Sequence, residues 1–193
     1  MRERFQEIVR YLVDLKDTSE LMMDLAYSAL LLNSRELAEE VERLEERIDF
    51  LHHNFQLLVL SSRRMGEEAE DYLGLIRIGE ATERIADAAA EIAEVVLRGV
   101  EPHPVLRLVI EDAEETVVRV RISEDSPLAG KTLKEARIPE QTGMWVLVMR
   151  RGDQWMRPKP GTMLQPGDVL IASGYAEGEE DFRRLAGGEG DQG

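Results

Sequence analysis

The sequence contains no cysteine, which excludes disulfide bonds, thiolate metal sites and a cysteine nucleophile. It also contains no run approaching the roughly 20 apolar residues that a membrane span needs. The N-terminal stretch lacks the uninterrupted apolar core of a signal peptide. These absences predict a cytoplasmic protein with no direct membrane insertion.

Positive charge is also scarce, with 24 Lys and Arg residues against 39 Asp and Glu and a formal net charge of −15. Non-specific nucleic-acid binding depends on neutralising phosphates, so this charge argues against a nucleic-acid partner. The same charge opposes binding to an anionic lipid surface by electrostatics alone. Small ligands, metal ions and other proteins remain as the expected partners.

The first hundred residues have the periodicity of long helices. Apolar residues recur at three- and four-residue steps between residues 5 and 32, until Asn33 interrupts the pattern. Asn33 and Glu36 have the spacing of a capping box, which predicts that a second helix starts there. The apolar seam of this second helix is Leu37, Val41, Leu44, Ile48, Leu51, Phe55 and Leu58.

A third helix is predicted from Glu67 to Arg98. Short turns between three helices favour an antiparallel, up-down-up bundle. The third helix has more apolar surface than one neighbour can cover, and this surplus predicts a homodimer. Its main stripe is Leu75, Ile78, Ala81, Ile85, Ala88, Ile92 and Val95, and beside it lie Tyr72, Ile76, Gly79, Ala86, Ala89, Ala93 and Val96.

Beyond residue 104 the pattern changes to that of a sheet. One glycine and two prolines between residues 99 and 104 end the helical half, and residues 105–110 have the pattern of a helical turn. Val118, Val120 and Ile122 alternate with polar residues, which predicts a strand with one buried face. Thr132 and Glu135 form a second capping box, so a short helix is expected there. A strand buried on both faces is predicted at residues 144–149. Two more strands are predicted at residues 154–157 and 169–173, and a terminal helix at residues 177–185.

These patterns predict an α+β protein of two domains. Residues 1–101 form an antiparallel three-helix bundle, and residues 105–186 form a small α+β domain with a mainly antiparallel sheet. Residues 187–193 are predicted to be disordered. No G-x-G-x-x-G motif follows a predicted strand, so a dinucleotide-binding domain is not expected.

The motifs of both domains resemble known families. Residues 126–138, SPLAGKTLKEARI, and 146–174, VLVMRRGDQWMRPKPGTMLQPGDVLIASG, resemble the C-terminal domain of the TrkA and RCK potassium-transport regulators, TrkA-C. Residues 44–49, LEERID, and 78–94, IGEATERIADAAAEIAE, are similar to one three-helix repeat of the PhoU family.

The resemblance implies a non-enzymatic regulatory subunit of a membrane cation transporter or channel, most directly one for potassium, that senses a small ligand or ion through its TrkA-C domain. Such a protein is cytoplasmic and reaches the membrane through its transporter partner. The alternative implied by the bundle is a PhoU-type, divalent-metal-binding protein of phosphate regulation, in which the TrkA-C domain only dimerises.

Basic residues gather around the Pro-rich turn of the second domain. Arginine is suited to bidentate contact with phosphate or carboxylate groups. The TrkA-C resemblance implies that the dimer interface holds a small ligand, in some members cyclic di-AMP. The alternative is a set of surface cations that offset local acids. The candidate ligand residues are Arg150, Arg151, Arg157, Pro158 and Lys159.

Two pairs of acids in the bundle are spaced as metal ligands. Glu45 and Asp49 stand four residues apart, as do Glu83 and Asp87, so each pair projects from one helix face and could share a divalent cation. The PhoU resemblance implies that these are metal ligands. The alternative is a solvated helix face on which arginines pair with the acids.

Other features have simpler interpretations. His52 and His53 are predicted to lie at the rim of the bundle, because their neighbours occupy the predicted core positions. No serine lies in a G-x-S-x-G context, and heptad helices provide no cleft for paired catalytic acids, so no enzymatic activity is predicted.

Overall fold

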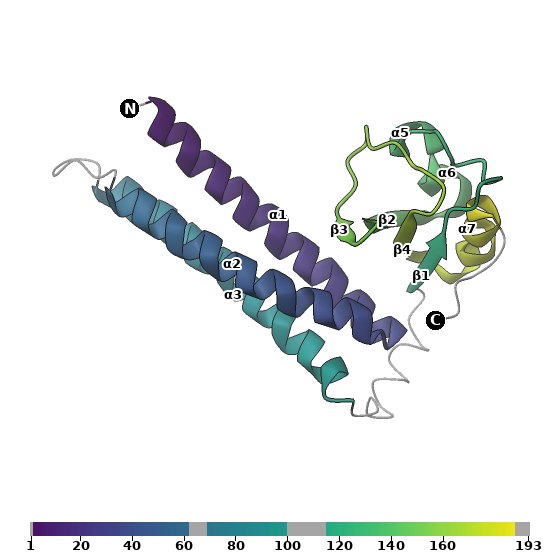
Figure 1. Cartoon of the computed structure of the whole chain (residues 1–193), viewed down its shortest axis with the longest axis horizontal. Helices are drawn as coiled ribbons and strands as arrows, with labels where there is room; N and C mark the ends of the chain where they lie inside the picture. Colours follow the sequence, from purple (N-terminus) through teal and green to yellow (C-terminus); the bar gives the residue numbers. More distant parts are fainter. Residues whose placement is uncertain (1, 62–68, 100–114, 188–193) are drawn as a thin grey trace. The chain divides into compact units, whose positions relative to one another are not determined.

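The computed structural model describes residues 2–61, 69–99 and 115–187. The chain divides into two compact units, Met1–Val100 and Glu101–Gly193. The first contains three long helices and the second a sheet with short helices, which confirms the predicted α+β fold (Figure 1). The predicted domain boundaries, the turn at 105–110 and the tail beyond residue 187 lie outside the described residues. Within these ranges, no helix is both long enough and apolar enough to cross a membrane.

The three helices of the first unit run antiparallel in sequence order, as predicted, and each packs against both others (Figure 1). The first helix ends in a Schellman motif, in which Asn33 has a φ of 47° and the N–H of Ser34 donates to the carbonyl of Ala29. The carbonyl of Ser34 accepts the N–H of Ala38, so Ser34 is the N-cap of the second helix. Asn33 therefore closes the first helix and does not cap the second. The helices are α1 Arg2–Leu32, α2 Arg35–Ser61 and α3 Ala69–Leu97.

The seam predicted for α2 is correct in its first half and shifts in its second. Its members from Leu37 to Ile48 are buried. Beyond them His52 and Val59 are buried, whereas Leu51 and Leu58 are only half-buried. An α-helix has 3.6 residues per turn, so a strict 3.5-residue repeat drifts away from the neighbouring helices along its length.

α3 buries small residues and exposes large ones. Ala86, Ala89 and Ala93 are buried against the other helices. Ile78 and Ile85, which belong to the stripe that the sequence pattern favours, are 51% and 46% exposed. Interaxial distance depends on side-chain size at the contact, so small residues allow α3 to pack closely on α1 and α2.

The second unit is built on a four-stranded sheet in which every neighbouring pair is antiparallel, as predicted. The order is β1-β4-β2-β3, so the last strand lies between the first two. Gly152, with a φ of 58°, lies in the two-residue turn between β2 and β3. The strands are β1 Glu115–Arg121, β2 Met144–Arg151, β3 Gln154–Met156 and β4 Val169–Tyr175.

Short helical segments accompany the sheet. Thr132 Oγ1 accepts the N–H of Glu135, and the Glu135 carboxylate accepts the N–H of Thr132, which confirms the predicted capping box. A second helix, which the sequence pattern did not predict, follows Arg137 and has Pro139 in its first turn. The segments are α5 Leu133–Ala136, α6 Ile138–Thr142, η1 Ala176–Gly178 and α7 Glu179–Ala186.

One face of the sheet forms the core with these helices. Val118, Val120 and Ile122 are buried there, as their alternation predicts, and Phe182 of α7 is fully buried in the same cluster. The prediction that β2 is buried on both faces is wrong at Trp145, which is 52% exposed. A nearly continuous apolar run does not distinguish a strand with one covered face from a strand with two.

Candidate functional sites

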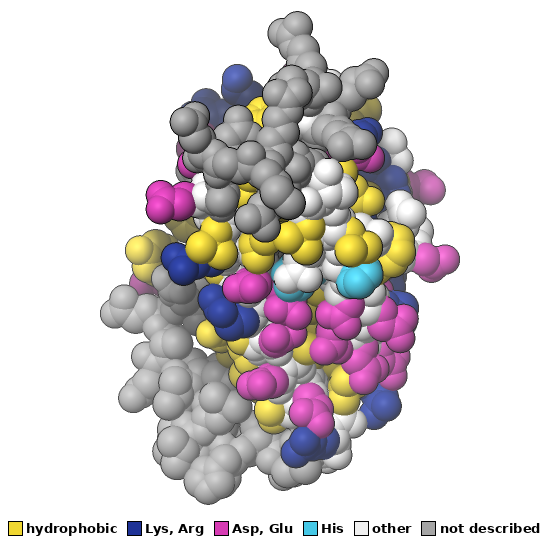
Figure 2. All heavy atoms as spheres, turned by 90° about the vertical axis from the view of Figure 1, so that its left-hand side faces the viewer, with side chains coloured by type: hydrophobic (Ala, Val, Ile, Leu, Met, Phe, Trp, Pro, Cys, Tyr) yellow, Lys and Arg dark blue, Asp and Glu magenta, His cyan; other side chains and the backbone are white. Residues whose placement is uncertain are grey.

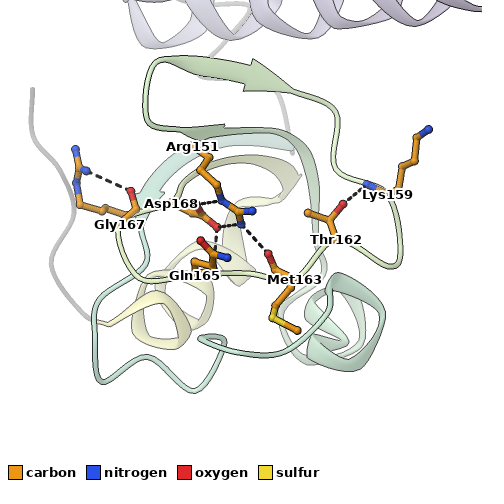
Figure 3. Close-up of polar contacts among 8 residues, drawn as sticks. Arg151, Lys159, Thr162, Met163, Gln165, Gly167 and Asp168 are labelled. Atoms are coloured by element: carbon orange, nitrogen blue, oxygen red, sulfur yellow. Dashed lines mark hydrogen bonds and ion pairs between the residues drawn. The ribbon is translucent and has the colours of Figure 1, made fainter.

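An ion pair links the end of β2 to the start of β4. Arg151 is the last residue of β2, and Asp168 precedes β4 directly after the turn at 166–167. The guanidinium donates from Nε to Oδ1 of Asp168 at 2.9 Å and from Nη2 to Oδ2 at 2.7 Å (Figure 3). Asp168 is only 2% exposed, so this bidentate pair neutralises a carboxylate that folding removes from water.

Arg151 also fixes the loop before β4. Its Nη2 donates to the carbonyl of Met163 at 2.7 Å, while Oδ2 of Asp168 accepts the N–H of Gln165 at 2.8 Å (Figure 3). The side-chain hydrogen bond with Asp168 raises the pKa of Arg151 above its ordinary value. These contacts give Arg151 a structural role, and its contact with a ligand stays a prediction.

Arg150 belongs to a different face of the sheet from Arg151, because successive strand residues point to opposite sides. It pairs in register with Trp155 of β3, and its guanidinium carbon lies 5.4 Å from the centre of the indole ring. This distance is within the range of a cation–π interaction. The two adjacent arginines therefore do not form one basic cluster.

The segment after β3 carries the other predicted ligand residues. Arg157 and Lys159 are exposed, and Pro158 is half-buried. The N–H of Lys159 donates to Oγ1 of Thr162 at 2.9 Å, which closes the turn, and the lysine side chain points away from Arg151 (Figure 3). The five predicted residues thus lie on neighbouring segments, but Arg150, Arg151 and Lys159 point in different directions.

The acids predicted as metal ligands lie on two neighbouring helices, with Glu45 and Asp49 on α2 and Glu83 and Asp87 on α3. Burial raises the pKa of Glu45, and the negative charges of Asp49 and Asp87 raise it further. Because Asp87 belongs to α3, its effect on Glu45 indicates that these two acids are near enough across the helix interface for their charges to repel. Figure 2 shows a face of the molecule on which Asp and Glu side chains gather into a patch beside histidines.

His52 borders these acids from inside the bundle. It is 8% exposed, so the prediction of a rim position is wrong for His52, whereas His53 is exposed. Its Nδ1 lies 3.6 Å from Oε1 of Glu83, and its buried Nε2 has no hydrogen-bond partner within the described residues. A Cβ at Gly79 would lie 2.7 Å from Cε1 of Phe55 and 3.6 Å from Cδ2 of His52. The glycine therefore makes room for both rings. Gly79 is the sequence feature that goes with the buried position of His52, and the helical periodicity of α2 alone did not reveal it.

The acidic pairs do not form a closed metal site. Within the described residues, no three His, Asp or Glu side chains lie close enough together to hold a metal ion. Glu45 and Glu83 are half-buried, while Asp49 and Asp87 are exposed. Hard divalent cations prefer carboxylate oxygens, so these residues supply suitable chemistry without a preformed geometry. Metal binding stays a prediction.

Two protein-family models match the chain. The PhoU domain model matches residues 12–96, and the TrkA-C domain model matches residues 117–187. The first match falls on the helical bundle, and the second includes β2, β3, β4 and the short helices. Both resemblances drawn from the sequence motifs are confirmed.

Curated relatives include two proteins of Methanocaldococcus jannaschii. Potassium channel protein 1 is 34% identical over 76 residues, which are 39% of this chain and 23% of the relative. Probable potassium channel protein 2 is 44% identical over 57 residues, which are 29% of this chain and 17% of the relative. The chain therefore spans less than a quarter of the length of either relative.

One similar solved structure is the RCK C domain of the potassium transport protein KtrA in complex with cyclic di-AMP. It is 26% identical, covers 42% of this chain and 94% of that domain, and has a TM-score of 0.35. The GsuK channel bound to NAD is 22% identical, covers 60% of this chain and 21% of that chain, and also has a TM-score of 0.35. The family models thus match two parts of this chain, with the PhoU domain over residues 12–96 and the TrkA-C domain over residues 117–187.

Proposed function

We propose that this protein is a non-enzymatic regulatory subunit of a membrane cation transporter or channel, most directly one for potassium, and that its TrkA-C domain senses a small ligand or ion. The observation that carries this proposal is the TrkA-C match over residues 117–187, which agrees with the resemblance of the sequence motifs to potassium-transport regulators. The identities of 34% and 44% to two potassium channel proteins support the same assignment.

The proposed mechanism is a population shift between two arrangements of a homodimer. A ligand held between two TrkA-C domains stabilises the arrangement that binds it more tightly, by the difference in its affinity for the two states. The helical domains then carry the rotation or displacement of the subunits to the transporter. Cyclic di-AMP is the first ligand to test, because the motif resemblance is to a family in which some members bind it.

The dimer in this mechanism is supported by the apolar surface that α3 leaves exposed. Ile78, Ile85 and Val95 are 51%, 46% and 44% exposed. Ala81 and Ala88 are also exposed and belong to the same predicted stripe. An apolar stripe of this length along one helix is a typical protein interaction surface.

Sedimentation equilibrium tests the dimer directly. The double variant Ile78→Glu and Ile85→Glu places charge on the stripe, so it should be monomeric at concentrations where the unchanged protein dimerises. Leu57→Glu, at a position that is 52% exposed on α2, is the matched control and should remain dimeric. A monomeric unchanged protein, or a dimer that survives the double substitution, contradicts the proposed interface.

A thermal-shift screen against nucleotides, cyclic dinucleotides and metal ions tests ligand sensing. A ligand present at a hundred times its dissociation constant stabilises the folded protein by about 2.7 kcal/mol. Arg157→Ala and Lys159→Ala should reduce the shift, because both side chains are exposed near the Pro-rich turn. Arg77→Ala, an exposed position on α3, is the control. A flat screen with well-folded protein rejects ligand sensing.

Rubidium uptake in host cells tests the biological role. Cells that lack this chain should take up rubidium at an altered rate, and the unchanged chain should restore the original rate. The Arg157→Ala variant should restore it only in part if ligand sensing controls the transporter. An unchanged rubidium rate together with altered phosphate uptake contradicts the potassium assignment and supports the alternative.

The alternative is divalent-metal binding by the PhoU domain in phosphate regulation. It is favoured by the PhoU match over residues 12–96 and by the effect of the Asp87 charge on Glu45 of the neighbouring helix. Metal analysis after chelation and reloading tests it. Stoichiometric metal that is lost in Glu83→Ala and Asp87→Ala, but retained in Glu20→Ala on α1, supports this role. Absence of bound metal in the reloaded protein rejects it.

A further inference from the structure

The outward side of α1 carries exposed apolar residues near both ends of the helix. The opposite side, which includes Leu15, Met22 and Leu25, is fully buried against α2 and α3. Large apolar side chains on a helix face that no neighbour covers are typical of an interaction surface. The exposed positions are Phe5 (66%), Val9 (44%), Val13 (46%), Tyr27 (52%) and Leu31 (37%).

Three further positions complete this surface. The side chains of Lys16 and Glu20 are 58% and 38% exposed, and Met23 is half-buried. At 3.6 residues per turn, all eight positions fall within an arc of about 80° around the helix. They form one surface with a charged centre and apolar ends. The α1 stripe is defined as Phe5, Val9, Val13, Lys16, Glu20, Met23, Tyr27 and Leu31.

The α1 stripe has the same spacing in both directions along the chain. Its successive steps are 4, 4, 3, 4, 3, 4 and 4 residues, so it is symmetric about position 18. Lys16 and Glu20 lie equally far from this centre, as do Val13 and Met23. Two copies of α1 that pack antiparallel about position 18 therefore bring these residues opposite one another. The remaining facing pairs are Val9 with Tyr27 and Phe5 with Leu31.

The charged centre distinguishes an antiparallel second copy from other occupants. Within one copy, Nζ of Lys16 lies 3.1 Å from Oε2 of Glu20. In an antiparallel pair each lysine also faces the glutamate of the other copy, so every central charge meets its opposite. In a parallel pair, lysine would face lysine and glutamate would face glutamate, which is unfavourable. Charge complementarity thus selects both the partner and its direction.

We propose that the α1 stripe binds the α1 stripe of a second copy, antiparallel and about a two-fold axis at the level of position 18. Such a contact is isologous, because the same surface serves both copies. It runs along about 40 Å of helix, from Phe5 to Leu31. The apolar pairs supply hydrophobic contact, and the central charges fix the register of the two helices.

This contact does not depend on the proposed function and is separate from the dimer that the exposed residues of α3 support. Pairing of the α1 stripe removes Lys16 and Glu20 from water, which offsets much of their attraction. The α1 contact should therefore be weaker than one through the uncharged stripe of α3. It should join α3 dimers into larger assemblies at higher protein concentration, and act alone where the α3 contact is removed.

Charge reversal tests the pairing in full-length protein that also carries Ile78→Glu and Ile85→Glu, so that the α3 stripe does not contribute. Lys16→Glu alone and Glu20→Lys alone each set like charges opposite one another and should weaken self-association about tenfold. An equimolar mixture of the two variants should associate as the unreversed protein does, because opposite charges face again. Sedimentation equilibrium measures all three samples.

The matched control reverses an exposed ion pair of the same spacing on α2. Nε of Arg35 lies 2.8 Å from Oε1 of Glu39, and both side chains are exposed. Arg35→Glu and Glu39→Arg should leave self-association unchanged, alone or mixed, and circular dichroism should show that every variant is folded. The proposal is overturned if the unreversed protein does not self-associate, or if mixing the two α1 variants does not restore association.

Disulfide trapping tests the direction and register, because the chain has no cysteine of its own. Val13→Cys in one copy and Met23→Cys in another should form a disulfide when the two are mixed and oxidised. Val13→Cys alone should not, since the antiparallel pair separates its two cysteines by about 15 Å. Efficient cross-linking of Val13→Cys with itself indicates a parallel pair and overturns the proposal. Vesicle binding without cross-linking in the mixture identifies lipid as the occupant and also overturns it.

Discussion

In the helical bundle Glu45 is repelled by neighbouring acids, whereas in the sheet domain the most buried acid, Asp168, is neutralised. The pKa of Glu45 is raised by burial and by neighbouring carboxylates. Asp168, at 2% exposure, receives two hydrogen bonds from Arg151 and one from a backbone N–H. The charge of Glu45 thus opposes folding of the bundle, while Asp168 helps to hold the fold of the sheet domain.

This difference affects how the motifs are interpreted. The TrkA-C motif residues Arg151 and Asp168 bind each other, and Thr132 and Glu135 cap a helix, so the recognisable residues of this domain stabilise its turns. A sequence match to such residues identifies the domain without identifying its ligand contacts. In the bundle, by contrast, the recognisable acids make no comparable contribution to the core.

The largest expected effect tests the structural role of the buried acid. Asp168→Ala leaves Arg151 without its partner and should lower the free energy of unfolding of the sheet domain by about 3 kcal/mol. Tryptophan fluorescence during urea unfolding reports this domain, because Trp145 and Trp155, the only tryptophans, both belong to it. Glu140→Ala, which removes an exposed ion pair with Arg137, is the control and should cost at most about 1 kcal/mol. Equal costs would show that the Arg151–Asp168 pair stabilises the domain no more than an exposed ion pair does.

Two glycines of α3 test packing in the bundle. Gly79→Ala should destabilise the bundle by about 1–3 kcal/mol, because the new Cβ would overlap the buried Phe55 ring. Gly74→Ala, with no atom within 4 Å of the new Cβ, should stabilise it by about 0.5–1 kcal/mol. Far-ultraviolet circular dichroism during urea unfolding measures both. Stabilisation by Gly79→Ala would show that the ring can move aside and that the interface is loosely packed.

The capping box provides a smaller effect in the sheet domain. Thr132→Ala removes the side-chain acceptor for the N–H of Glu135 and should cost about 1 kcal/mol. Tryptophan fluorescence during unfolding again gives the change. Thr82→Ala, in the middle of α3, should alter the stability of the bundle, followed by far-ultraviolet circular dichroism, by no more than about 0.5 kcal/mol. If Thr132→Ala leaves the free energy of unfolding unchanged, the turn is held by its backbone hydrogen bonds alone.

The smallest expected effects are on the pH dependence of the free energy of unfolding, in which two carboxylates of the protein should behave in opposite ways. The pKa of Glu45 is raised in the folded protein, so its charge destabilises the bundle above that pKa, and the cost disappears as pH falls through it. Glu45→Gln should therefore stabilise the bundle by about 0.2–0.5 kcal/mol at neutral pH, with no gain in acid.

Glu135 should behave in the opposite way. Hydrogen bonds from the backbone and side chain of Thr132 lower its pKa, so its stabilising effect is present above the unfolded-state pKa and is lost as pH falls through the lower, folded-state value. Glu135→Gln should destabilise the sheet domain at neutral pH and have no effect in strong acid. Urea unfolding at several pH values measures both variants, and parallel pH profiles would contradict the assigned causes.

The order of helices and strands could be predicted from the sequence because their signals are local. Three- and four-residue spacing identified the helices, and Thr132 with Glu135 identified the start of α5. α6 was missed because it depends on Arg137, a non-glycine residue with a φ of 45° that no local pattern marks. The candidate site residues were placed on the correct elements, but their contacts depend on the neighbouring segments.

The sequence by itself determined which residues share a helix face or a strand face, since this follows from the period of each element. Only the tertiary structure decided which face is buried, because that depends on the sizes of side chains on other elements. Gly79 opposite Phe55 places His52 inside the bundle and leaves Ile78 exposed. Likewise, the return of β4 beside β2 brings Asp168 to Arg151 and gives this arginine a structural contact that the sequence pattern did not predict.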